Sequence, residues 1–322
     1  PARRLSAMLA RAPRVAALRQ VAALRQVAAL RQVAALRQVA PRGARLLAQQ
    51  AYAVTPYREL ASATAAQREA WAVQDELLHA RMKEHVPAAL EHNGEESFAN
   101  HLVGVQSVLR SWSASETLCN AALFHSIYGT EGFQGYKLPL SHREEIARLI
   151  GSEAERLAWI FCMVDRASVD ESVLRGAGSD LEQRGFRSRI ELGAFAIPLA
   201  SEQEWLDFIT LSLADWLEQV EGAATKANPA ARWAEGEAWA YRRDAYAAMA
   251  ALLGERGVAA APRMYAEVFA REPAATRALA QPVTPPMSDA ARDAYEARAS
   301  AQWAMDGPAV ARQHAWQPAP RQ

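Results

Sequence analysis

The sequence predicts an all-α protein, and three observations lead to that prediction. Apolar residues recur at helical spacing in successive segments between about residues 67 and 271. Residues that end or begin helices separate these segments, as where Gly151 precedes Ser152. The alternating pattern of a strand occurs only weakly, around residues 190–198. We therefore expect a compact helical bundle with a helical N-terminal segment and a helical C-terminal extension.

The N-terminal segment, residues 1–50, is basic and repetitive. It holds ten arginines and no acid, and the motif VAALRQ occurs four times in tandem from Val15 to Gln38. Alanine, leucine, arginine and glutamine all favour helix, so the repeat predicts a long helix. Successive repeats rotate by roughly 240° around a helix axis, so their leucines form no constant seam for a coiled coil. We favour a solvated helix left by duplication over a basic arm for nucleic acid or an organelle transit segment.

Turn and capping signals divide the remaining chain into helical segments. Asn93-Gly94 marks a loop at residues 91–98, and a polar, glycine-containing stretch marks another at residues 171–185. Ser141 and Glu144 have the spacing of a capping box. We expect helices at residues 67–86, 97–112, 115–127, 141–150, 152–167 and 202–222, followed by a helical pair at 231–254 and 259–271.

These boundaries suggest four parts along the chain. They are the VAALRQ-repeat segment at 1–50, a helical domain at 60–225, a helical extension at 226–280 and a flexible Pro/Ala-rich tail at 281–322, with one further helix predicted at 288–305. The tail has few apolar positions at regular spacing, which is why only one helix is predicted there.

The composition restricts the classes of partner and compartment. Cys119 and Cys162 are the only cysteines, and both lie in apolar helical patterns, so we expect a reducing compartment and a cytoplasmic protein. No apolar run reaches the roughly 18 residues that a membrane span needs. The formal net charge is +0, so nucleic acid is not an expected partner although the N-terminal segment is basic.

Three polar residues fall on otherwise apolar helix faces. His101 lies beside the apolar stripe of its helix, His125 continues the stripe of the next, and Asp215 interrupts the apolar run LSLADWL. A buried carboxylate needs a cation, a metal or strong donors, and two histidines with one carboxylate suit Zn, Mn or Fe(II). The alternative is that the histidines donate to backbone carbonyls and that Asp215 pairs with Arg166.

The order of these motifs resembles the HD superfamily of metal-dependent phosphohydrolases. The chain offers His101, then AALFHS at 121–126, GSEAERL running into MVDR at 151–166, and LADWLEQ at 213–219. The pattern is most similar to the hydrolase domain of the bacterial alarmone synthetase/hydrolase proteins, over roughly residues 96–222. The string LFHSIYGTEGF also looks like the signature of an uncharacterised HD-like family of unknown function.

The resemblance implies a compact HD-like bundle that hydrolyses a phosphorylated small molecule or nucleotide. His101, His125 and Asp215 would hold a divalent metal, and Ser126 stands where the HD pattern has an aspartate ligand. Ser126 would then orient water or a phosphate oxygen, and Glu131 would act as general base. The implied substrate-binding residues are Tyr128, Lys137, Asp165 and Arg166, although Asp165 also fits a surface acid at a helix end.

Two other functions remain open at this point. Without the missing aspartate, the chain could be a non-catalytic HD-like protein that binds a ligand or serves as a scaffold. A non-haem iron oxygenase on the same fold would need an additional ligand, for which His142 is the candidate. His142 is otherwise explained as an exposed residue at a helix start.

Overall fold

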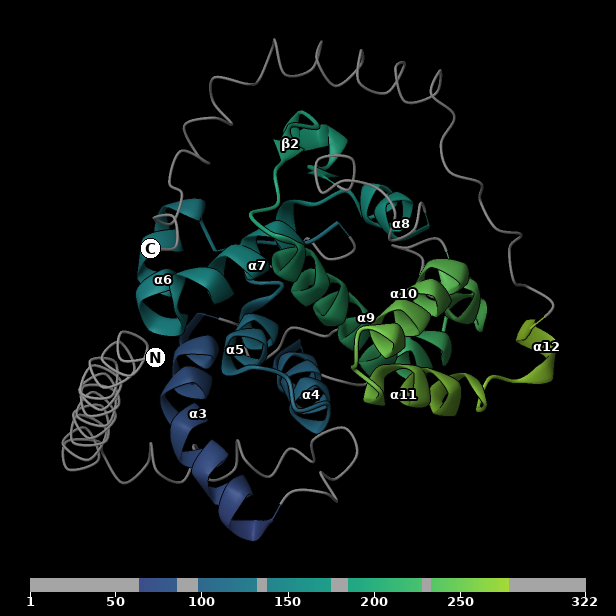
Figure 1. Cartoon of the computed structure of the whole chain (residues 1–322), viewed down its shortest axis with the longest axis horizontal. Coiled ribbons are helices and arrows are strands. Elements are labelled where there is room, and N and C mark those ends of the chain that lie inside the picture. The colour runs from purple at the N-terminus through teal and green to yellow at the C-terminus, as the bar shows by residue number, and fades with distance from the viewer. Residues whose placement is uncertain (1–63, 86–97, 132–137, 175–184, 228–232, 278–322) are drawn as a thin grey trace, which may run out of the picture. The chain divides into compact units, whose positions relative to one another are not determined.

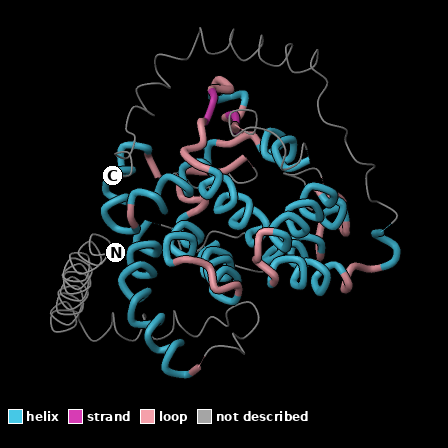
Figure 2. The backbone as a smooth tube through the Cα atoms, viewed as in Figure 1, coloured by secondary structure: helices cyan, strands magenta, loops and turns pink. Residues whose placement is uncertain are grey.

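The computed structural model describes residues 64–85, 98–131, 138–174, 185–227 and 233–277, and over these residues it is all-α (Figure 1). Strand is confined to two short segments, as Figure 2 shows. The fold class predicted from the sequence is therefore confirmed. The VAALRQ repeat and the helix predicted at 288–305 lie outside the described residues. In the described part, no helix combines the length and apolar character needed to cross a bilayer.

The helices and two strands follow one another along the chain. Two strands pair antiparallel, with Phe186 opposite Ile197. The elements are α3 (Ala65–His85), α4 (Phe98–Ser111), α5 (Glu116–Phe124), α6 (Arg143–Ile150), α7 (Ser152–Met163), α8 (Arg166–Leu174), β1 (Phe186–Arg187), β2 (Ala196–Ile197), α9 (Glu202–Ala224), α10 (Arg243–Glu255), α11 (Ala260–Phe269) and α12 (Ala274–Arg277). Three short 3₁₀ helices complete them, at Leu140–His142, Ile190–Leu192 and Glu237–Ala240.

The helix predicted at 152–167 is interrupted. Helix α7 ends at Met163 because Val164 is extended and forms a bridge with Ser188. Helix α8 then begins at Arg166 and continues to Leu174, into residues for which the sequence predicts a loop. The carboxylate of Asp165 accepts from the Ala167 amide at 2.9 Å and so supports the first turn of α8. Of the weak strand pattern near 190–198, only Ala196–Ile197 is strand, and Ile190–Leu192 is a 3₁₀ helix.

Not every predicted helix start is correct. Gly151 ends α6 with φ 94°, as its position in the sequence predicts. Ser141 does not cap α6, because it lies inside the 3₁₀ turn that runs straight into that helix. Side-chain caps occur instead at Ser115 and Ser201, whose hydroxyls accept from the amides three residues further on at 3.2 and 3.1 Å.

Helix α9 is the centre of the bundle. It contacts α4, α5 and α7 as well as α10 and α11, so apolar residues cover most of its circumference (Figure 1). Trp205, Phe208 and Leu213 are all buried on it. Helices α10 and α11, which the sequence assigns to a C-terminal extension, thus pack on the same helix as α4 and α5. A polar residue in the middle of α9 is necessarily buried.

A buried ion pair joins α6, α7 and the turn after α5. Arg143 donates to both carboxylate oxygens of Glu155, at 2.7 and 2.9 Å, and both residues are buried. The hydroxyl of Tyr128 donates to the same carboxylate at 3.0 Å. Tyr128 lies three residues after His125, so this network fixes the position of the segment that carries the histidine.

Replacing Glu155 with leucine should leave a buried guanidinium without its counter-charge. We expect the free energy of unfolding in Glu155→Leu to fall by about 3–5 kcal/mol in equilibrium urea titrations. The double variant Arg143→Met/Glu155→Leu removes both charges and should be less destabilised than the single variant. Arg148→Met, on the exposed side of α6, should change stability by no more than about 0.5 kcal/mol. A double variant as unstable as Glu155→Leu would contradict this account.

Candidate metal centre

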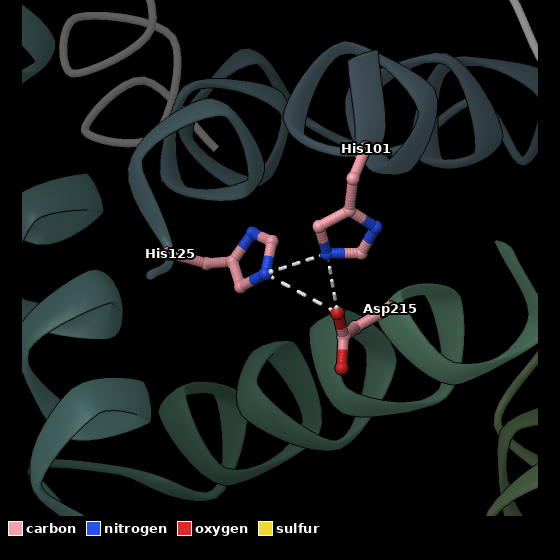
Figure 3. A group of neighbouring side chains, drawn as sticks. All are labelled: His101, His125 and Asp215. Atoms are coloured by element: carbon pink, nitrogen blue, oxygen red, sulfur yellow. Dashed lines mark hydrogen bonds and ion pairs between the residues drawn. The ribbon is translucent and has the colours of Figure 1, made fainter. Parts of the chain in front are cut away.

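Three side chains from three helices converge at one buried point (Figure 3). His101 lies in the first turn of α4, His125 directly follows α5, and Asp215 lies in the middle of α9. Their side chains are 2 %, 1 % and 3 % exposed. The structure thus brings together the three residues that the sequence singles out as ligands.

The three atoms that face one another form a nearly equilateral triangle. His101 Nε2 lies 3.3 Å from His125 Nε2 and 3.1 Å from Asp215 Oδ1, and His125 Nε2 lies 3.2 Å from the same oxygen. Ligand atoms of a tetrahedral zinc ion, with bonds of about 2.0–2.1 Å, stand roughly 3.3 Å apart. The spacing of the donor atoms therefore fits one shared metal ion.

The Nδ1 atom of each imidazole, which faces away from Asp215, already has a hydrogen-bond partner. His125 Nδ1 lies 2.6 Å from the carbonyl oxygen of Ala122, which can only accept, so Nδ1 carries a proton. His101 Nδ1 lies 2.5 Å from Glu218 Oε2 and donates to that carboxylate. A neutral imidazole has a single N–H, so in their neutral forms, which a bound metal ion requires, both rings present an Nε2 lone pair on the side of Asp215.

Three lone pairs this close repel one another unless positive charge lies among them. A metal ion supplies that charge, and so do additional protons on the histidines. Burial disfavours the charged form of His101, but the carboxylates of Glu218 and Asp215 outweigh this and raise its pKa to about 10. Burial likewise opposes ionisation of Asp215, but hydrogen bonds to His101 and His125 hold the pKa of that carboxyl well below its usual value. The pair of buried carboxylates thus attracts cations strongly.

The charges of the group match a divalent ion. Asp215 and Glu218 contribute two negative charges, and both are buried beside the imidazole of His101. A divalent ion brings the total to zero, which is the state that a low-dielectric interior favours. Neither imidazole would then need an extra proton. The donor set, its spacing and its charge all fit a divalent transition metal such as Zn, Mn or Fe.

Supporting contacts fix the orientation of each ligand. Gln219 Nε2 donates to Asp215 Oδ1 at 2.9 Å, and Cys162 Sγ donates to the His125 carbonyl at 3.1 Å. Glu218 and Gln219 are not among the site residues that the sequence pattern predicts. Their spacing of three and four residues from Asp215 places all three on one face of α9, which is a signal that could have found them.

Gly104 makes room for the carboxylate that supports His101. A Cβ atom at this position would lie 2.3 Å from Glu218 Oε1, so any side chain on residue 104 must displace Glu218. Gly104 lies three residues after His101 on α4, and both residues therefore face α9. The approach of Glu218 to His101 depends on this glycine.

A small pocket adjoins the centre and shares Asp215 with it. The space enclosed between its lining side chains is about 10 Å³, enough for roughly one water molecule. The lining residues are Phe161, Val164, Arg166, Val169, Phe208, Ser212, Asp215, Arg242 and Tyr246.

Of the residues predicted to bind substrate, only Arg166 lines this pocket. Arg166 forms no ion pair with Asp215, which is directed at the two histidines. Asp165 supports the first turn of α8, and Tyr128 is bonded to Glu155 in the core instead of lining a pocket. Lys137 lies outside the described residues.

The two residues predicted to act on water occupy different surroundings. Ser126 is buried beside His125, and its hydroxyl has no hydrogen bond to the residues that the structure describes. Glu131 is exposed, and its carboxylate accepts from the Arg166 amide at 2.9 Å, at the start of α8. His142 pairs with Glu145 at 3.1 Å on the exposed 3₁₀ turn and is not part of the ligand group.

Comparison with known proteins gives one family match. A model described as a domain of unknown function, DUF6817, matches residues 81–166, which include His101, His125, Ser126 and Arg166. Asp215 and Glu218 lie beyond the matched residues. Neither the curated proteins nor the solved structures contain a match to this chain.

Gly104→Ala tests the support that Glu218 gives to His101 without altering either residue. The added methyl should push the flexible Glu218 side chain away and leave the fold intact. Because such supporting partners are worth about 10–100-fold in metal affinity, we expect zinc to bind that much more weakly in competition with a chromophoric chelator. Ser107→Ala, one turn further along α4, should bind zinc like the wild type. Unchanged affinity in Gly104→Ala would contradict the role assigned to Glu218.

Proposed function

We propose that this chain is a divalent-metal-dependent hydrolase of a phosphorylated small molecule or nucleotide, with an HD-like site. The observation that carries the proposal is the convergence of His101 Nε2, His125 Nε2 and Asp215 Oδ1 within 3.3 Å of one another. Three protein ligands leave coordination positions open, which is the arrangement of catalytic sites and not of closed structural ones. Order along the chain and helical setting support the HD assignment.

The roles of the residues follow from their contacts. His101, His125 and Asp215 hold the ion, while Glu218 and the Ala122 carbonyl keep the imidazoles turned toward it. A bound divalent ion supplies Lewis-acid polarisation of a phosphoryl oxygen and lowers the pKa of water. Hydrolysis adds the water oxygen to phosphorus, breaks the P–O ester bond and releases the alcohol.

Ser126 is the residue next to the centre that departs from the HD pattern. As a neutral side chain it leaves the charge of the site to Asp215 and Glu218, and we assign it the orientation of water or a phosphate oxygen. Glu131 receives no role in proton transfer, because its carboxylate is bonded to the amide that starts α8. The proposal therefore depends on the ion and its ligands.

A non-catalytic protein that binds the same ligands is the second candidate. Ser126 in place of an acid favours it, together with the position of Glu131 away from the ligand group. Both candidates predict a bound metal, and only the first predicts turnover. The iron-oxygenase interpretation loses its additional ligand, because His142 pairs with Glu145 on an exposed turn.

Metal analysis of the purified protein tests the ligand assignment. After equilibration with zinc, manganese or iron(II) and removal of free ions, we expect about one ion per chain by inductively coupled plasma mass spectrometry. His125→Ala and Asp215→Asn should each lose the ion, since each removes one of three ligands. His142→Ala is the matched control and should retain it. Retention of the ion by His125→Ala would contradict the proposed metal centre.

Turnover separates the two candidates. The metal-loaded protein is assayed against phosphate monoesters and nucleotides by phosphate or pyrophosphate release. The hydrolase proposal predicts activity that falls by at least about a hundredfold in Asp215→Asn. A protein that binds one ion and shows no release from any of these substrates is the result expected of the non-catalytic candidate.

A further inference from the structure

The two carboxylate oxygens of Asp215 have different surroundings. Oδ1 lies 3.1 Å from His101 Nε2 and 3.2 Å from His125 Nε2, and it accepts from Gln219 at 2.9 Å. Oδ2 is directed away from the two rings (Figure 3), and it has no hydrogen bond or ion pair with the residues that the structure describes. An ionised carboxylate shares its charge between both oxygens, so a buried Oδ2 needs a donor of its own.

The small pocket beside the metal centre lies against this carboxylate. Its enclosed space of about 10 Å³ fits one water molecule, and a buried water needs two to four polar partners. Besides Asp215, the polar lining residues are Arg166, Ser212, Arg242 and Tyr246. A single water is therefore a ligand of suitable size for which the pocket has enough polar groups.

Two hydroxyl groups in the pocket wall have bonding capacity left for such a water. The Tyr246 hydroxyl accepts from Arg242 Nη1 at 2.9 Å, so its own proton can be donated to another group. The Ser212 hydroxyl has no hydrogen bond to a described residue, and Ser212 lies three residues before Asp215 on α9. Residues at this spacing share one face of a helix, so the Ser212 hydroxyl and the Asp215 carboxylate lie on the same side of α9.

Arg166 brings a positive charge to the same pocket without contacting Asp215. Its half-buried guanidinium has no ion pair or hydrogen bond in the described ranges, and its Cζ lies 5.7 Å from the centroid of the Phe161 ring. Burial opposes this charge, but Tyr241, Tyr246 and Asp215 outweigh burial and raise the pKa of the guanidinium. A water molecule can join such a pair, because it donates to a carboxylate and accepts from a guanidinium, nearly as favourably as a direct hydrogen bond.

We propose that one water molecule occupies this pocket and bridges Asp215 Oδ2 to the guanidinium of Arg166. Its second hydrogen is donated to the Ser212 hydroxyl, and its second lone pair accepts from Tyr246. Arg166 is then a positioning residue, which holds Asp215 through the water with Oδ1 directed at the histidines. Neither a bound metal ion nor the hydrolase assignment is needed for this water.

A crystal structure of the metal-free full chain, at a resolution that shows ordered water, tests the bridge directly. We expect a single-atom peak at about 2.5–3.2 Å from Asp215 Oδ2 and at a similar distance from a guanidinium nitrogen of Arg166. A direct ion pair between Arg166 and Asp215, or a pocket without this peak, would overturn the proposal.

Ser212→Val and Ser212→Ala test the same water in solution, by urea titration of the chelator-treated protein. The methyl groups of valine occupy the space of the water and leave Oδ2 without a donor, whereas alanine leaves that space open. We expect the equilibrium constant for unfolding to be at least about tenfold larger in Ser212→Val than in Ser212→Ala. The lower helix propensity of valine explains only about threefold. In a dry pocket the added methyl groups would fill a void, so a difference below tenfold contradicts the bridge.

A double-mutant cycle tests whether Arg166 acts through the water. Arg166→Met should raise the equilibrium constant for unfolding at least about fivefold in the wild type and not further in Ser212→Val, where the link is already lost. Arg148→Met, on the exposed side of α6, should have little effect in either background. An equal effect of Arg166→Met in both backgrounds would overturn the role of Arg166. If Ser212→Val does not fold, the crystal structure still decides, and metal content separately tests the proposed function.

Discussion

Two buried imidazoles face one carboxylate oxygen with their Nε2 atoms, and this arrangement needs positive charge between the three groups, from a metal ion or from protons on the rings. The Nδ1–H of His101 donates to Glu218, and the Nδ1–H of His125 donates to the Ala122 carbonyl. Rotating either ring would break a buried hydrogen bond, so the protein holds the ligands in place at a cost in repulsion. Gly104 belongs to the same arrangement, because it admits the Glu218 carboxylate.

Helix α9 connects the centre to the neighbouring pocket. Asp215 is part of both, Glu218 and Gln219 stabilise the centre, and Ser212 lines the pocket one turn earlier. Packing of α4, α5, α7, α10 and α11 around α9 excludes bulk water from its middle, which strengthens every charge interaction there. A single helix thus carries one of the candidate metal ligands and lines the neighbouring pocket.

The sequence predicts the fold class and the ligand group because both depend on local periodicity. His101, His125 and Asp215 stand out as polar residues on apolar faces, and a buried polar group has few explanations. Arg242 and Tyr246 could not be found this way, since Tyr246 lies on α10 and Arg242 directly before it, far along the chain from Arg166. The break at Val164 depends on pairing with Ser188, and the misassigned cap at Ser141 depends on the 3₁₀ turn before α6. Such long-range or turn-specific contacts leave no regular pattern in the sequence.

X-ray absorption at the zinc edge of the zinc-loaded protein tests the central claim most directly, because it reports the atoms bound to the ion. The account predicts two imidazole ligands with nitrogen at about 2.0–2.1 Å, completed by oxygen from a carboxylate and solvent. The imidazole contribution should decrease in His125→Ala. A spectrum without imidazole scattering, or one unchanged by His125→Ala, would place zinc elsewhere and contradict a metal centre at His101, His125 and Asp215.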